Sequence, residues 1–387
     1  MEPRIFNTIR AKAPAIMDWD AVTVKLIKDP GKPLTQVSEL GVVHAGLEPA
    51  SAVYRLTDEK TQFILKLHLD PDTFRREVAN ITFVNSFDRV APELHCCDDG
   101  TRAILMEDLG DRNLAHLWHR NHMDEYSAWC RRAFTILADI QAYCEDHEGL
   151  LLEAYGESIP QRALSLPLPR GIATTLNEVL SVSRGVGLAE VDESFLGRID
   201  GLLRMRMSQF EARHRGFLLD LTPWHVLEKD GRIRVLDLTA PPLGGLLSQF
   251  NVLWHLPTRR EIITLYLTRR EERGMRNIDH DEFHWLQDGL QLLECIQWMR
   301  NYCRQILERE HSFTNLDGSR PNDYQRSENA QLAAIREALD PHADLSPVTQ
   351  ILERYFRKPV HLPGSQQVPV SAQPSAGGDA EDRAPQP

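Results

Sequence analysis

The chain has 387 residues, enough for two domains or for two lobes that each have a core. Hydrophobic residues make up 42% and charged residues 26%, which is the composition of an ordinary soluble globular protein. The formal net charge of -12 argues against a general nucleic-acid-binding protein, which needs a basic face, but an acidic protein can still hold a nucleotide in a locally positive pocket.

Residues 1–35 are predicted to be an N-terminal extension, and residues 36–108 a β-rich N-terminal lobe with one helix. In that lobe, "AVYRLTDEK" and "TQFILKLHL" are two runs joined by a polar turn, which is typical of a β-hairpin. Because side chains alternate along a strand, Ile64, Lys66 and His68 are expected on one face of the second run. Lys66 is therefore a cation that stands between apolar neighbours.

A helix is predicted to follow over "DPDTFRREVANITFVNSF", where Phe74, Val78, Ile81 and Val84 recur at helical spacing. Glu77 lies near the middle of this helix, so an acidic side chain follows the strand lysine by one element. The lobe is predicted to end with a buried strand, "AILM", which runs directly into "EDLG".

Residues 109–360 are mostly helical in pattern and predict a large C-terminal lobe. Residues 150–172 are rich in Leu and Pro, and we expect them to form an irregular connection. Trp285 and Trp298 lie in a long predicted helix, where we expect them to be core residues. Residues 361–387 are rich in Pro, Ala, Gly and Gln, and their few large apolar side chains predict a disordered tail.

One β-hairpin interrupts the helical lobe, in the stretch "DLTPWHVLEKDGRIRVLD". Asp220 opens the stretch and Asp237 closes it, each at the end of an apolar run, and His225 follows the first aspartate by five residues. In an ordinary surface hairpin the two aspartates would be turn residues. The order of elements instead favours a two-lobed α+β protein with a site between the lobes, where both strand ends open on a cleft.

Phosphoryl transfer needs a cation on the nucleotide phosphates and a carboxylate that holds this cation in place. It also needs a base for the attacking hydroxyl and oxygen ligands for a metal ion. Lys66, Glu77, Asp220 and Asp237 supply this set in this order. Each of them taken alone has a plain alternative as a solvated surface or turn residue, so the prediction depends on the four together.

The ordered set resembles the aminoglycoside phosphotransferase and choline kinase branch of the protein-kinase-like superfamily, of which this chain would be a divergent member. The resemblance spans residues 40–256. "LLDLTPWH" occupies the place of the catalytic loop, "VLDLTAPPLGG" that of the metal-binding segment, and "AILMEDLG" that of the hinge. It implies a bilobal protein-kinase-like α+β fold, with a small β-rich N-lobe and a large, mostly helical C-lobe.

The resemblance also implies roles for the site residues. Lys66, held by Glu77, would neutralise phosphate charge, and Asp220 would orient and deprotonate the acceptor hydroxyl. Asp237 would bind Mg²⁺, and His225 would either assist it as a second ligand or hydrogen-bond Asp220 or the phosphates instead.

The same resemblance places the rest of the nucleotide in the N-lobe. Backbone groups at Glu107, Asp108 and Leu109 would bind the adenine. Backbone N–H groups near Gly46 and Ser51 would approach the phosphates.

The chain differs from the family pattern in its phosphate loop, where Gly46 is the one internal glycine, and in the catalytic and metal-binding segments. Leu218 and Leu219 stand where the family has His-Gly, and His225 stands where it has an asparagine. Ser248 and Gln249 stand where a structural aspartate is expected. Mg²⁺ prefers oxygen ligands, whereas an imidazole suits softer divalent ions better.

The expected function is ATP-dependent transfer of the γ-phosphoryl group to a hydroxyl of a small molecule, such as a sugar, an amino alcohol or an aminoglycoside-like compound. ATP and Mg²⁺ are the expected cofactors. The alternative is a pseudokinase, a catalytically weak or inactive module that binds a nucleotide or a partner. The differences in the catalytic loop favour this alternative.

The sequence also predicts where the protein is found. No apolar run approaches the ~18 residues that span a bilayer, and the N-terminus lacks the apolar segment of a signal peptide. We therefore expect a cytoplasmic protein without a membrane or nucleic-acid partner. The six cysteines form no C-x-x-C pair, which argues against a disulfide framework and a structural zinc site.

Overall fold

The computed structural model describes most of the chain between residues 36 and 357. The described residues are 36–45, 48–57, 62–156, 158–162, 168–253, 256–308 and 321–357. The predicted N-terminal extension and C-terminal tail therefore lie outside the described residues, and so does Gly46.

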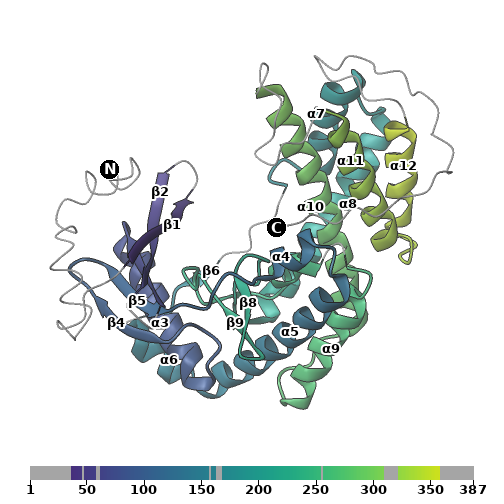
Figure 1. Cartoon of the computed structure of the whole chain (residues 1–387). Helices are drawn as coiled ribbons and strands as arrows, with labels where there is room; N and C mark the ends of the chain where they lie inside the picture. Colours follow the sequence, from purple (N-terminus) through teal and green to yellow (C-terminus); the bar gives the residue numbers. More distant parts are fainter. Residues whose placement is uncertain are drawn as a thin grey trace, which may run out of the picture.

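A five-stranded antiparallel sheet forms the N-terminal lobe, with the strand order β1-β2-β3-β5-β4 (Figure 1). Its strands are β1 (Gln36–Ala45), β2 (Glu48–Thr57), β3 (Gln62–His68), β4 (Leu94–Asp98) and β5 (Ala103–Glu107). The predicted hairpin is present as β2 and β3, whose register pairs Val53 with Lys66. Lys66 is also paired with Ile104 of β5, so it lies in the middle of the sheet.

Helix α3 (Pro71–Phe87) packs against this sheet, as predicted. Asp70 caps its start, because its carboxylate accepts hydrogen bonds from the backbone N–H groups of Asp72 and Thr73. Proline at the first helical position needs no hydrogen-bond partner there. The face of α3 that carries Glu77 is buried against the sheet.

The C-terminal lobe is mostly helical, and it contains the main hydrophobic core (Figure 1). Its helices are α4 (Leu114–His119), α5 (Met123–Asp146), α6 (Glu148–Tyr155), α7 (Ile172–Arg184), α8 (Glu190–Arg213), α9 (Arg259–Glu272), α10 (His280–Glu308), α11 (Pro321–Leu339), α12 (Ser346–Phe356) and the 3-10 helix η2 (Leu247–Leu253). Helices α5 and α9 lie side by side, while α7, α11 and α12 gather around α10 and α8 at the far end of the molecule. The expected two-lobed α+β fold is thus confirmed.

The prediction of an irregular connection over residues 150–172 is wrong in part. Helix α6 continues to Tyr155, because Leu151 is fully buried in the core and α6 packs on α3. Beyond it, the two-residue strand β6 (Gln161–Arg162) pairs with β10 (Leu243–Gly245), which in turn pairs with β7 (Arg215–Phe217). Tertiary packing here overrides a sequence that is rich in turn-forming residues.

The second predicted hairpin is formed by β8 (Val226–Lys229) and β9 (Arg232–Val235). Asp230 and Gly231 at its tip have φ angles of 53° and 74°, as a two-residue hairpin turn requires. The backbone N–H of Val235 donates to the carbonyl of Val90, which ties the hairpin to the N-terminal lobe. Among the described helices, none is long and apolar enough to cross a membrane.

Candidate active site

Lys66 connects the two lobes through two carboxylates. Its Nζ lies 2.8 Å from Oε1 of Glu77 on α3 and 2.5 Å from Oδ1 of Asp237, which follows β9. Lys66 and Glu77 are both buried, and Asp237 is half-buried. The alternation of β3 produces this contact, because it turns Lys66 and His68 together toward α3.

The buried pair is ionised. Burial alone would lower the pKa of Lys66, but the charges of Glu77 and Asp237 outweigh it and raise that pKa. Burial alone would raise the pKa of Glu77, but Lys66 and a hydrogen bond with His68 lower it to about 2. Nε2 of His68 lies 2.7 Å from Oε2 of Glu77, so a basic side chain lies beside each oxygen of this carboxylate.

The loop before β8 carries Asp220. Its Oδ1 accepts a hydrogen bond of 3.1 Å from the backbone N–H of Thr222. Just before it, the backbone N–H of Leu219 donates to Oε1 of Gln249 over 2.8 Å. The buried side chain of Gln249 therefore stabilises this loop. Gln249 stands where the resemblance leads us to expect a structural aspartate.

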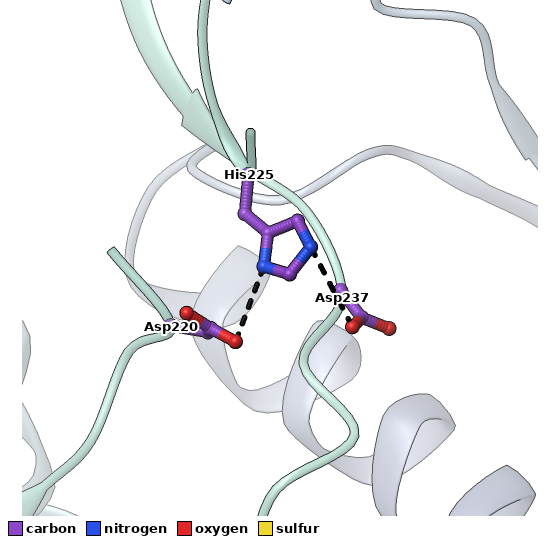
Figure 2. Close-up of side chains that lie close together, drawn as sticks. All are labelled: Asp220, His225 and Asp237. Carbon is purple, nitrogen blue, oxygen red and sulfur yellow. Dashed lines mark ion pairs between the residues drawn. The ribbon is translucent and has the colours of Figure 1, made fainter. Parts of the chain in front are cut away.

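His225 lies between the two aspartates of the hairpin (Figure 2). Its Nδ1 is 3.1 Å from Oδ2 of Asp220 and 2.9 Å from Oγ1 of Thr222, and its Nε2 is 3.7 Å from Oδ2 of Asp237. The ligand atoms of Asp220, His225 and Asp237 all lie within 4.8 Å of one another, which is close enough to hold a metal ion.

The charges of this trio support one another. Burial alone would raise the pKa of Asp220, but the contact with His225 outweighs it and lowers that pKa. Burial alone would lower the pKa of His225, but Asp220 and Asp237 raise it. Asp220 is therefore a carboxylate at neutral pH.

Helix α3 also fixes the segment that follows Asp237. Nδ2 of Asn80 donates to the carbonyl oxygens of Leu238, at 2.7 Å, and Ala240, at 3.0 Å. The hydroxyl of Tyr155 donates to Oδ1 of the same asparagine over 2.7 Å, so this buried amide is satisfied on both sides. Asp237 adopts a left-handed φ of 56°, which is uncommon for a residue other than glycine, and this clamp holds it there.

A first cavity of about 710 Å³ opens between the sheet and the β8–β9 hairpin. Val53 and Ile64 of the sheet and Leu227 of the hairpin form apolar walls, and Lys66 and Asp237 lie at one side. Apolar walls with a cation beside them suit a flat ring that carries an anionic group.

The predicted hinge residues line this cavity, and their side chains are already paired. Glu107 contacts Lys229 at 2.9 Å and Arg234 at 2.7 Å. Asp108 contacts Arg55 at 2.5 Å, and Leu109 is buried. The backbone is paired in part as well, because the N–H of Glu107 donates to the carbonyl of Glu93 and the carbonyl of Asp108 accepts from Nζ of Lys229.

One of the two residues predicted to approach the phosphates is not brought to the site. Ser51 is buried in β2 and does not line the first cavity. Gly46 lies outside the described residues.

A second cavity of about 640 Å³ begins at Asp220. Trp118, Trp224 and Trp298 line it, and each of these rings is exposed. Trp224 lines the first cavity as well, so the two cavities are adjacent. The prediction that Trp298 is a core residue is wrong, because this residue is 53% exposed.

Glu294 of α10 also lines the second cavity. Burial raises the pKa of its carboxyl to about 7. Within the described part of the chain, this carboxyl has no hydrogen bond or ion pair. Sequence reasoning missed Gln249 and Glu294. The only signal for Gln249 was its position about a dozen residues after Asp237, and Glu294 had none.

No protein-family model and no curated protein matches the chain. Solved structures do match it. A microcompartment-associated aminopropanol kinase is 14% identical over 84% of this chain and 98% of its own, with a TM-score of 0.49. A choline/ethanolamine kinase family protein from Mesorhizobium loti is 14% identical over 88% of this chain and 99% of its own, with a TM-score of 0.43.

A third solved structure is a thermostable mutant of an aminoglycoside phosphotransferase, in a ternary complex with AMP-PNP and hygromycin B. It is 11% identical over 82% of this chain and 99% of its own, with a TM-score of 0.43. All three are similar to this chain at 11–14% sequence identity and with TM-scores below 0.5.

Proposed function

We propose that the chain is an ATP-dependent phosphotransferase that moves the γ-phosphoryl group to a hydroxyl of a small molecule. The observation that supports this most strongly is the junction of the two cavities. Lys66, His225 and Asp237 line the first cavity, Asp220 lines the second, and Trp224 lines both. A phosphate in the first cavity and a hydroxyl in the second would meet beside the Asp220–His225–Asp237 trio.

The nucleotide binds in the first cavity. Its purine lies between the apolar walls of the sheet and hairpin, and the backbone of Glu107 to Leu109 binds the purine edge. Lys66 contacts the phosphates. Because Glu77 and Asp237 hold this ammonium before the nucleotide arrives, little free energy is lost in ordering it.

The cation site would be formed by Asp237, with His225 as a second ligand. A bound divalent cation supplies positive charge to the β- and γ-phosphates. The carboxylate suits Mg²⁺, the ion that the resemblance implies, but the imidazole does not match its preference for oxygen.

Asp220 acts on the acceptor. It accepts the proton of the hydroxyl while the oxygen forms a bond to the γ-phosphorus and the bond to the β-phosphate oxygen breaks, so that ADP leaves. Its lowered pKa keeps it unprotonated before the reaction. The N–H of Thr222 and the His225 ring fix the orientation of the carboxylate.

Among the expected acceptors, the second cavity favours one that carries an amine. Asp220 and Glu294 place two carboxyl groups in its lining against one guanidinium, that of Arg162. Exposed tryptophan rings attract cations through their π faces, by about 0.5–1 kcal/mol at such sites. An amino alcohol or an aminoglycoside-like compound fits this lining better than a neutral sugar.

The test is a screen of amino alcohols, aminoglycosides and sugars with ATP labelled at the γ-phosphate. We expect labelled product from an amine-bearing acceptor, and a loss of about 10²–10⁴-fold in kcat for Asp220→Asn, which removes the base. Asp230→Asn at the tip of the same hairpin is the matched control and should keep the activity, because asparagine tolerates the left-handed backbone there.

Two outcomes would contradict the proposal. If the wild-type protein transfers no phosphate to any compound, while ATP raises its melting temperature without added metal, the chain is a nucleotide-binding pseudokinase. If ATP produces no thermal shift either, the first cavity is not a nucleotide site.

A further inference from the structure

We propose that the cation site selects a first-row transition ion, such as Mn²⁺, over Mg²⁺, and that Nε2 of His225 binds this ion directly beside Oδ2 of Asp237. The inference rests on the proposed function and names the class of cofactor at the same site.

The distance between the two ligand atoms suits a shared metal ion. Nε2 of His225 and Oδ2 of Asp237 are 3.7 Å apart, which is too long for a hydrogen bond. Ligand atoms about 2.1 Å from one ion are separated by about 3.0 Å at a right angle and about 3.4 Å at a tetrahedral angle. A closure of a few tenths of an ångström, within the freedom of the two side chains, brings both atoms onto one ion.

The other ring nitrogen of His225, Nδ1, lies beside Asp220. Nδ1 of His225 lies 3.1 Å from Oδ2 of Asp220, and a carboxylate can only accept a hydrogen bond. The same Nδ1 lies 2.9 Å from the hydroxyl oxygen of Thr222, which can donate or accept. With the ring proton on Nδ1 and directed to Asp220, Nε2 faces Asp237 (Figure 2), and a bound cation takes the place of any proton on Nε2. A histidine whose second nitrogen donates to a carboxylate is the usual arrangement of a metal-binding imidazole.

The two carboxylate oxygens of Asp237 have different neighbours. Its Oδ1 is taken by Lys66 at 2.5 Å, whereas Oδ2 is the oxygen on the side of His225. One carboxylate thus serves the ammonium and the ion at once. The clamp from Asn80 to the two carbonyl groups after Asp237 keeps this orientation.

The donor set decides the kind of ion. Mg²⁺ takes oxygen ligands in octahedral geometry and is a poor partner for an imidazole. First-row transition ions accept mixed nitrogen and oxygen ligands, and their affinity for such sites rises along the series from Mn²⁺. One imidazole and one carboxylate oxygen, completed by nucleotide phosphates and water, therefore favour Mn²⁺, Co²⁺ or Zn²⁺.

The experiment uses Mn²⁺ as the probe, with the full chain and a methylene-bridged ATP analogue that has no nitrogen near the metal. Pulsed electron paramagnetic resonance detects the ¹⁴N nucleus of a metal-bound imidazole directly. Competition of Mg²⁺ against the Mn²⁺ signal gives the ratio of the two dissociation constants. The variant is His225→Asn, and the matched control is His116→Asn, a second histidine that lines the first cavity.

We expect imidazole ¹⁴N modulation in the wild-type protein and in His116→Asn, and its loss in His225→Asn. We also expect the Mn²⁺ over Mg²⁺ preference of the wild type to exceed that of His225→Asn by about tenfold, because His225 is a direct ligand and even the loss of an outer-shell partner is typically worth 10–100-fold in metal affinity. Bound Mn²⁺ without imidazole modulation, an unchanged preference in His225→Asn, or no Mn²⁺ binding would each overturn the inference.

The readout needs no turnover, so it separates this inference from the proposed function. If no acceptor is phosphorylated but the imidazole modulation is present, the phosphotransferase proposal fails and the cation site remains. If phosphate transfer occurs and the modulation is absent, the reverse holds.

Discussion

The two cavities that meet at Trp224 are built in opposite ways. In the first, charged side chains are tied to one another before any ligand arrives, as in the Lys66–Glu77 and Arg55–Asp108 pairs. In the second, three exposed tryptophan residues line the cavity together with Glu294, whose carboxyl has no partner among the described residues. The contrast indicates that the first cavity is organised for one fixed charge pattern, whereas the second leaves its carboxyl free for a ligand.

The strongest way to break this contrast is to remove the charge that organises the first cavity. In Lys66→Met, we expect kcat/KM for ATP to fall about 10²–10³-fold, because a preorganised group that stabilises developing charge is lost. We also expect about 3–5 kcal/mol less free energy of unfolding, because Glu77 is left buried without its cation. Steady-state kinetics and urea denaturation measure the two effects.

The double variant Lys66→Met with Glu77→Gln separates stability from activity. It removes the uncompensated charge, so it should regain most of the lost free energy of unfolding while remaining inactive. Recovery of phosphate transfer in the double variant would show that Lys66 has no part in the chemistry.

A smaller effect is expected at Gln249, which supports the loop between the two cavities. Gln249→Ala leaves the buried N–H of Leu219 without an acceptor, which costs about 1–3 kcal/mol. We expect kcat to fall about tenfold with KM for ATP unchanged, because the loss displaces Asp220 and not the nucleotide, and a misplaced catalytic group is costly.

Gln291→Ala is the matched control for Gln249. Gln291 is also buried, and its side chain donates to a backbone carbonyl, that of Ala334, away from Asp220. It should lower the melting temperature and keep kcat. An equal loss of kcat in both variants would mean that Gln249 acts through general stability alone.

The smallest expected effect is a pH dependence of KM for the acceptor, which depends on Glu294 in the second cavity. Burial raises the pKa of Glu294 from its ordinary value of 4.5 to about 7, so the carboxyl is neutral below that pH and anionic above it. For a quaternary ammonium alcohol, whose charge does not change with pH, KM should therefore fall about tenfold from pH 6 to pH 8, in proportion to the ionised fraction.

Glu294→Gln should abolish that dependence and leave KM for ATP unchanged. Glu261→Gln, which alters an exposed carboxylate paired with Arg131, should keep the wild-type profile. A pH dependence of KM that survives in Glu294→Gln would assign the titration to another group and remove the reason to regard Glu294 as an acceptor ligand.

The sequence predicted the first cavity far better than the second. Lys66 and Glu77 lie on adjacent elements, and the alternation of a strand and the period of a helix decide which way they face. The hairpin around Asp220 and Asp237 is local as well. Because these features depend on residues that are close together in the sequence, the sequence pattern predicts them.

The second cavity depends on how distant helices pack, and the sequence does not contain that information locally. Trp298 has the spacing of a core residue on α10, but no neighbouring helix covers it among the described residues, so its ring borders a cavity. In the sequence, Gln249 stands where a structural aspartate is expected, which suggests that the role of this aspartate is lost. Its longer side chain in fact reaches the same loop, which only the relative position of η2 and the loop could reveal.

The most direct test of the central claim is chemical labelling of Lys66 by an ATP acyl phosphate, followed by peptide mapping. The account predicts that the probe acylates Lys66, that excess ATP prevents it, and that Lys229, which does not line the first cavity, is not labelled in an ATP-sensitive way. Labelling of Lys66 that ATP does not prevent, or ATP-sensitive labelling at another lysine alone, would contradict the assignment of the first cavity to a nucleotide.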